Sequence, residues 1–226
     1  MRVCASIMEP TIEGFVEKAS MARGADMIEV RADGLTGQSA PQVEELLRSI
    51  KGLRDVPVIL TNRSKSEGGA FEGSEKRRIA ILLRCMSLAD LVDVEYTAEK
   101  GLRDGVIEEA KEGGTEVIVS QHDFKATPDE NEMLSMLRKG LEAGADIAKL
   151  AVTANSVGDV LSLLNVTSEA RKEGRVITIA MGEIGRLSRI AAPLFGSEIT
   201  YASVGEAVAP GQLELNELKT ILEALA

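Results

Sequence analysis

Short runs of β-branched and other apolar residues alternate with longer segments of helical periodicity along the whole chain. Apolar side chains in the longer segments recur every three or four residues, which predicts helices with one buried face. The short runs begin near Val3, Asp26, Pro57, Asp90, Thr115, Ala145, Val176 and Glu198. Eight alternating strand and helix patterns predict a (β/α)8 TIM barrel, with a doubly wound open sheet as the alternative.

Several residues predict where the helices lie and where they begin or end. Thr97 and Pro128 are typical of helix starts, whereas Gly24 and Gly144 are typical of left-handed helix ends before a strand. Only residues 182–197 separate the last two strand patterns, so the seventh helix must be short. The buried faces of two helices are predicted from Val157, Val160, Leu161 and Leu164, and from Leu215, Leu218, Leu222 and Leu225.

Composition narrows the class of protein. A chain of 226 residues predicts a single domain over 1–226, and 3% aromatic residues imply an aliphatic core. A net charge of −10 argues against a nucleic-acid or anionic-membrane partner. The chain enters a strand at once, with no signal or membrane segment, which predicts a cytoplasmic protein. One histidine and two cysteines predict neither a disulfide framework nor a metal cofactor.

Lys149 lies inside an apolar strand pattern, where a lysine is rarely buried without a reason. Desolvation favours the neutral, nucleophilic amine. His122, the one histidine, lies 27 residues earlier (149 − 122 = 27), and a barrel brings both strand ends to the same mouth. A lysine nucleophile beside a proton shuttle suggests imine chemistry on a carbonyl substrate. Taken alone, Lys149 is more typical of a structural ion-pair partner, and His122 is equally open to a structural and a functional interpretation.

Other polar or charged residues fall at matching places in the repeat. The first, second, third and seventh strands end with Ser6, with Glu29 and Arg31, with Arg63, and with Met181. Arg189 is expected in the loop after the seventh strand, where an arginine suits a carboxylate, although any one arginine alone is more typical of a surface salt bridge. Such a cluster is costly to bury unless it binds a ligand, which predicts a small anionic substrate.

Two loops complete the candidate site. The Gly-rich segment 61–78 is compatible either with a mobile substrate loop or with an ordinary solvated loop. Within it, Glu67 has the chemistry to orient His122, although spacing alone does not place it there. Pro210 and Gly211 predict a tight turn that presents Gln212 to the mouth or joins strand to helix.

The chain closely resembles the type I 3-dehydroquinate dehydratases of the shikimate pathway. The resemblance extends from VCASIM to VAPGQ and includes EVRAD, NRSKSEGG, VSQHDF, ADIAKLAV and IAMGEIGRLSR. It implies a Schiff-base lysine at Lys149, a proton shuttle at His122 and a supporting acid at Glu67. It further implies that substrate contacts come from Ser6, Glu29, Arg31, Arg63, Met181, Arg189 and Gln212.

The implied activity is a syn elimination of water from 3-dehydroquinate, giving 3-dehydroshikimate without a cofactor. The resemblance also implies a homodimer. The chain departs from the family at Val208, where Ser is usual, and at Tyr201, where Phe is common. A class I aldolase-like lyase and a non-catalytic barrel that senses an anionic metabolite remain as alternatives.

Overall fold

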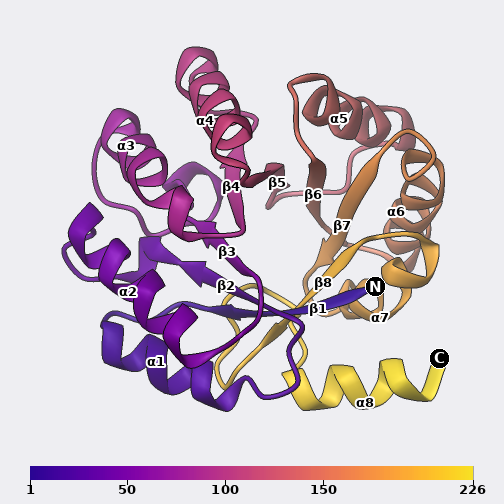
Figure 1. The fold of residues 1–226 in the computed structure, drawn as a ribbon. Helices are drawn as coiled ribbons and strands as arrows, with labels where there is room; N and C mark the ends of the chain where they lie inside the picture. Colours follow the sequence, from indigo (N-terminus) through magenta and orange to yellow (C-terminus); the bar gives the residue numbers. More distant parts are fainter. Residues whose placement is uncertain (226) are drawn as a thin grey trace.

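Eight parallel strands form a nearly closed barrel surrounded by helices (Figure 1) in the computed structural model, which describes residues 1–225. The strands are β1 Arg2–Ile7, β2 Met27–Arg31, β3 Val58–Thr61, β4 Leu91–Glu95, β5 Glu116–Asp123, β6 Ile147–Thr153, β7 Arg175–Met181 and β8 Ile199–Ser203. Neighbours along the chain pair in parallel, and β8 pairs with β1. At the remaining seam, β7 meets the start of β8 through a bridge between Val176 and Ser197. The predicted (β/α)8 barrel is confirmed.

A helix lies after each strand on the outside of the barrel (Figure 1). The helices are α1 Ile12–Met21, α2 Ala40–Leu53, α3 Glu75–Cys85, α4 Lys100–Gly113, α5 Glu130–Glu142, α6 Val157–Ala170, α7 Arg186–Phe195 and α8 Leu215–Leu225. Short 3-10 turns are η1 Ala32–Gly34, η2 Lys65–Glu67 and η3 Met86–Leu88. The seventh helix is short, as predicted. No helix in the described part of the chain is both long and apolar enough to cross a membrane.

Two predicted helix starts are displaced. Helix α4 begins at Lys100 rather than after Thr97, whose hydroxyl instead donates to the Glu67 carboxylate. Helix α5 begins two residues after Pro128, because the Asp129 side chain caps it by accepting from the Glu132 amide. Thr97 is therefore a site residue and not a helix cap.

The buried face predicted for α6 is only half right. Val160 and Leu164 are buried, but Val157 and Leu161 are 62% and 56% exposed. The core side of this helix is instead completed by Leu163, so α6 is apolar on both its inner and outer faces. On α8, the first three predicted leucines are buried, and Leu225 is exposed.

The strand starts are held by a repeated hydrogen bond at the base of the barrel, between an aspartate side chain and a backbone N–H. Gly24 and Gly144 adopt φ of +88° and +106°, the predicted left-handed helix ends. Two residues after each of them, Asp26 and Asp146 each accept a backbone N–H from the neighbouring strand at 2.8 Å. Asp90 does the same for the amide of Val58. An aspartate just before β2, β4 and β6 thus ties the start of each of these strands to its neighbour.

The barrel interior changes from apolar to polar toward the carboxyl ends of the strands. Each strand contributes one residue to an apolar layer: Cys4, Met27, Ile59, Leu91, Ile118, Ile147, Ile177 and Ile199. Side chains two residues further along each strand point inward again. That layer consists of Ser6, Glu29, Thr61, Asp93, Ser120, Lys149, Ile179 and Tyr201. Strand periodicity therefore delivers a set of buried polar groups to the mouth.

Candidate active site

One cavity opens at the mouth of the barrel, and every site residue predicted from the sequence lines it. Those residues are Ser6, Glu29, Arg31, Arg63, Glu67, His122, Lys149, Met181, Arg189 and Gln212. The prediction for Arg189 needs a correction, because this residue lies in the first turn of α7 rather than in a loop. Phe124, Val208 and Tyr201 also line the cavity.

Lys149 is buried beneath this cavity but is not in apolar surroundings. Its Nζ donates to Asp93 Oδ2 at 3.0 Å and lies 3.8 Å from Glu29 Oε1. The ring of Tyr201 packs against it, with its centroid 4.5 Å from Nζ. Two carboxylates and an aromatic face therefore surround the Lys149 amine at the base of the cavity.

Asp93 is the central acidic group of the site and was missed by sequence reasoning. Its fully buried carboxylate accepts from Ser120 Oγ at 2.6 Å and pairs with Arg63 Nη2 at 2.8 Å, in addition to Lys149. Burial opposes ionisation, but Arg63 and Lys149 outweigh it and hold the pKa of Asp93 well below its usual range. The available signal was the pair Asp93 and Glu95, two residues apart in an otherwise apolar strand.

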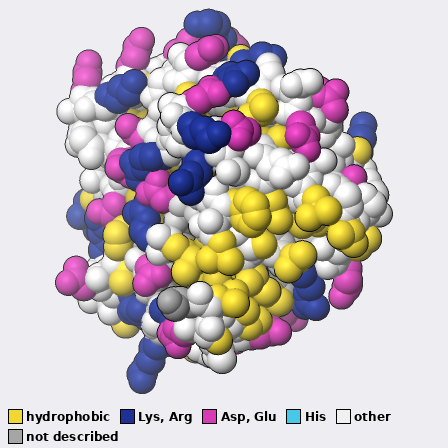
Figure 2. All heavy atoms as spheres, turned by 90° about the vertical axis from the view of Figure 1, so that its right-hand side faces the viewer, with side chains coloured by type: hydrophobic (Ala, Val, Ile, Leu, Met, Phe, Trp, Pro, Cys, Tyr) yellow, Lys and Arg dark blue, Asp and Glu magenta, His cyan; other side chains and the backbone are white. Residues whose placement is uncertain are grey.

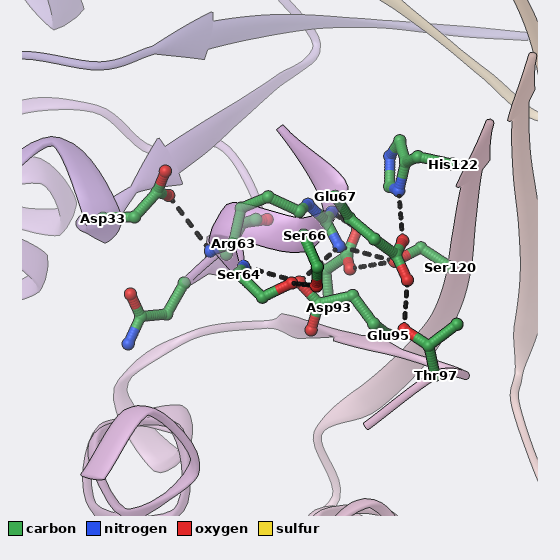
Figure 3. Close-up of polar contacts among 12 residues, drawn as sticks. Asp33, Arg63, Ser64, Ser66, Glu67, Asp93, Glu95, Thr97, Ser120 and His122 are labelled. Atoms are coloured by element: carbon green, nitrogen blue, oxygen red, sulfur yellow. Dashed lines mark hydrogen bonds and ion pairs between the residues drawn. The ribbon is translucent and has the colours of Figure 1, made fainter. Parts of the chain in front are cut away.

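His122 and Glu67 form a hydrogen-bonded pair at the side of the cavity (Figure 3), 2.8 Å apart between Nδ1 and Oε2. Burial raises the pKa of Glu67 to about 7. Burial, together with Arg63 and Lys149, lowers the pKa of His122 well below its usual value. The imidazole is therefore neutral near neutral pH and is available as a base.

The loop that carries Glu67 is tied down at both ends. Asp33 accepts the backbone N–H of Arg63 at 3.1 Å and that of Ala70 at 3.0 Å. Gly68 has φ of +77°, and a Cβ there would lie 2.2 Å from the Phe124 ring, so only glycine fits. These contacts set the position from which Glu67 reaches His122.

The three arginines of the site differ in how far they are neutralised. Arg31 makes a bidentate pair with Asp33 at 2.9 and 2.7 Å. Arg63 pairs with Asp93 and, at 3.1 Å, with Glu95 (Figure 3).

Arg189 makes no ion pair within residues 1–225. Its Nη2 donates to the Pro210 carbonyl at 3.3 Å, and its buried Nε has no hydrogen-bond partner there. Burial lowers the pKa of Arg189 to about 10, so the guanidinium is still charged at neutral pH. A buried, uncompensated cation is suited to binding an anionic group of a ligand.

Gln212 is oriented by the turn in which it lies. Its Oε1 accepts the backbone N–H groups of Val208 at 2.7 Å and Ala209 at 3.1 Å. The predicted turn is present, with Gly211 at φ of +75° packed against the Gly182 carbonyl. With its oxygen occupied, the Gln212 amide offers its N–H groups to the cavity.

Glu29 is held by two hydroxyl groups on neighbouring strands. Ser6 Oγ donates to Glu29 Oε2, and Thr61 Oγ1 donates to Oε1 at 2.9 Å. Met181 is buried at the end of β7, among the apolar residues inside the barrel. The cavity lining therefore combines a fixed carboxylate acceptor with an apolar surface.

The fold and cavity define a TIM-barrel enzyme with a buried lysine, a neutral histidine and an arginine that forms no ion pair within the described residues. A family model described as type I 3-dehydroquinase matches residues 3–226. The chain belongs to the type I 3-dehydroquinase family.

Relatives similar over nearly the full length support this assignment. The chain is 46% identical over 208 residues to the 3-dehydroquinate dehydratase of Methanococcoides burtonii, covering 92% of this chain and 88% of the relative. It is 45% identical over 229 residues to that of Methanosarcina barkeri, covering 99% and 94%.

Solved structures agree with the sequence relatives. The crystal structure of 3-dehydroquinate dehydratase from Geobacillus kaustophilus has a TM-score of 0.95 at 31% identity, covering 99% of this chain and 90% of that one. A type I enzyme from Clostridium difficile, with covalent modified comenic acid, has a TM-score of 0.93 at 31% identity, covering 99% and 91%.

Proposed function

We propose that this protein dehydrates 3-dehydroquinate to 3-dehydroshikimate through an imine on Lys149. The reaction is the hydro-lyase step of the shikimate pathway that defines the family. The observation that carries the proposal is the buried Lys149 in the same cavity as a neutral His122 and an Arg189 that has no counter-charge among residues 1–225. A relative from Clostridium difficile with covalent modified comenic acid lends support to covalent chemistry in such a cavity.

The proton on Lys149 must leave before the amine can attack. Asp93 is not assigned this role, because its carboxylate is already paired with Arg63 and accepts from Ser120. Neutral His122 is the remaining base that we assign to this transfer. The amine then adds to the C3 ketone, and the resulting carbinolamine loses water, with a proton from His122, to give the iminium.

The iminium withdraws electrons and acidifies the neighbouring C2 hydrogen. Neutral His122 removes that proton and leaves an enamine, and Glu67 stabilises the imidazolium. The enamine electrons expel the C1 hydroxyl, which takes the proton from His122 and departs as water. Hydrolysis of the imine releases 3-dehydroshikimate and restores Lys149. Use of one histidine for both proton transfers suits a syn elimination.

The remaining residues are assigned to the substrate's polar groups. Arg189 and the amide of Gln212 bind the carboxylate, because both offer unused donors. Glu29, Arg31, Arg63 and Ser6 bind or order the substrate hydroxyls, and Met181 packs beside the imine.

A turnover assay tests the proposal. The purified protein is incubated with 3-dehydroquinate, and absorbance of the conjugated enone of 3-dehydroshikimate is monitored. We expect steady formation of the enone. Tight binding without enone would favour a metabolite sensor, and cleavage of a sugar phosphate in a parallel assay would favour an aldolase; either result contradicts the proposal.

We further propose that the outer face of α6 and α7 is a homodimer interface. Figure 2 shows hydrophobic side chains gathered on this side of the molecule. The exposed apolar residues there are Val157, Leu161, Ile184, Leu187, Leu194 and Phe195. A contiguous patch of this kind is unusual on a monomer, and a two-fold pair would bury the same patch twice.

Solution mass separates the dimer from a monomer. Light scattering after gel filtration should give twice the chain mass, and Leu161→Lys with Leu194→Lys should give the single-chain mass. Leu53→Lys, at an exposed leucine on α2, is the matched control and should leave the dimer intact. A wild-type monomer, or a dimer unaffected by the paired change, would contradict this interface.

We also propose a cytoplasmic location. Cys4 and Cys85 are both buried and free, and unpaired thiols are typical of a reducing compartment.

A further inference from the structure

Tyr201 places a polar group in the cavity for which the mechanism above has no use. It lies on β8, is 3% exposed and lines the cavity. Its hydroxyl has no hydrogen-bond partner among residues 1–225. A buried hydroxyl without a partner destabilises a protein unless a ligand supplies the missing bond. The residue is also one of the two departures from the family pattern, which commonly has Phe at this position.

The neighbours of Tyr201 show where that ligand would lie. The face of its ring packs on Lys149, with 4.5 Å between ring centroid and Nζ. The adjacent Thr200 donates through Oγ1 to the Arg189 carbonyl at 2.8 Å, which joins β8 to the first turn of α7. Arg189 and Tyr201 thus line the same part of the cavity, and each has a buried donor that is unused within the described chain.

The charge state of Tyr201 fits a donor. Burial, reinforced by the carboxylate of Glu29, raises the pKa of the phenol well above its usual value. The group is therefore a neutral O–H throughout the working range of the enzyme. Tyr201 and Arg189 are both buried, at 3% and 2% exposed.

We propose that the Tyr201 hydroxyl and Nε of Arg189 together bind one carboxylate oxygen of the substrate. This assignment rests on the proposed function, since it takes Lys149 as the residue that binds C3. The tyrosine ring then spans the distance between the imine and the carboxylate, and its hydroxyl selects substrates that carry the acid. Tyr201 is accordingly a specificity residue that acts in binding and not in proton transfer.

The change Tyr201→Phe removes one oxygen and keeps the ring against Lys149. We expect KM for 3-dehydroquinate to rise roughly tenfold, the effect of one hydrogen bond to a charged acceptor, with kcat within about twofold of wild type. Without substrate, the Tyr201→Phe protein should have the same Tm as wild type or a higher one, because an unpaired buried hydroxyl has been removed. Tyr96→Phe is the matched control and should change neither value, since its ring packs on Arg103, 4.7 Å from the guanidinium carbon.

A second probe separates binding of the carboxylate from other effects. A cyclic polyhydroxy ketone without the carboxylate should inhibit wild type and Tyr201→Phe equally, while 3-dehydroshikimate should bind the variant about tenfold more weakly. An unchanged KM would overturn the proposal. A fall in kcat at constant KM would also overturn the proposal, because it would mean that the Tyr201 hydroxyl acts on the leaving group of the substrate.

Failure of the proposed function would be seen separately, as absence of turnover by wild type. In that case calorimetric titration with 3-dehydroshikimate still compares wild type with Tyr201→Phe. A tenfold lower affinity of the variant would support the carboxylate contact, and equal affinities would overturn it.

Discussion

The two ends of the barrel both carry arginine–carboxylate pairs, yet they differ in burial. At the mouth, Arg63 and Asp93 lie 2.8 Å apart with side chains 4% and 0% exposed. At the base, Arg175 and Glu116 also lie 2.8 Å apart, with side chains 39% and 44% exposed. Water screens the second pair and not the first. The same contact therefore fixes protonation states at the mouth and contributes little at the base.

The base of the barrel uses the same kinds of contact several times, whereas the mouth does not. Arg175 bridges Glu116 of β5 and Glu198 beside the β7–β8 seam, and Arg2 of β1 also pairs with Glu198. Asp26, Asp90 and Asp146 hold neighbouring strands by the same backbone contact. At the mouth, each strand supplies a different side chain. The repeated contacts at the base hold the strands together, so the side chains at the mouth can differ from strand to strand and form the active site.

Removal of the proposed proton shuttle should have the largest effect on turnover. His122→Ala should lower kcat by about 10²- to 10⁴-fold, the usual contribution of general acid–base catalysis. Steady-state assay of enone formation measures the loss. Turnover equal to wild type would exclude His122 from the mechanism.

Loss of the central carboxylate should have the largest effect on stability. Asp93→Asn leaves Lys149 without its closest counter-charge and Arg63 with Glu95 alone. We expect the free energy of unfolding to fall by about 3 kcal/mol, because removal of one partner strands a buried charge. Urea denaturation measures this change. If the free energy of unfolding fell by no more than it does on loss of an exposed ion pair, the greater burial of Asp93 would not add to stability.

The pH profile tests the pair formed by Glu67 and His122. Above its pKa of about 7, Glu67 is ionised and accepts the Nδ1 proton, which leaves Nε2 of His122 as a base. Below it, protonated Glu67 donates to Nδ1, and the imidazole carries its proton on Nε2. Wild-type kcat/KM should therefore rise with pH through about 7.

The variant Glu67→Gln cannot titrate. Its kcat/KM should lack the step near neutral pH and keep only the fall at lower pH where His122 itself becomes protonated. A step that persists in this variant would assign the titration to another group.

The smallest effect is expected at the base. Arg175→Gln should lower the free energy of unfolding by less than about 1 kcal/mol, since its pairs are partly exposed and screened. Its kcat/KM should match that of wild type. A loss of several kcal/mol would show that the seam between β7 and β8 depends on this residue.

Sequence patterns predict the features that depend on strand periodicity. Lys149 and His122 lie on strands that the sequence marks clearly, and the barrel brings their ends together. The left-handed helix ends at Gly24 and Gly144 are predicted from the repeated GAD segments. These features depend on local order, which is visible directly in the chain.

Other features depend on long-range contact. Glu67 meets His122 across 55 residues because of a loop held by Asp33, and no spacing rule gives that geometry. The exposed side of α6 is wrongly assigned to the core, because periodicity shows that a face is apolar and not what covers it. Asp93 was missed although its alternation with Glu95 marked an inward polar layer.

Covalent trapping tests the central claim most directly. The enzyme is mixed with 3-dehydroquinate, reduced with borohydride during turnover, and digested for mass spectrometry. We predict a stable substrate- or product-derived adduct on Lys149, absent in Lys149→Ala and still formed, slowly, in His122→Ala. Wild-type enzyme that turns over its substrate and yields no adduct on Lys149 would contradict the imine mechanism.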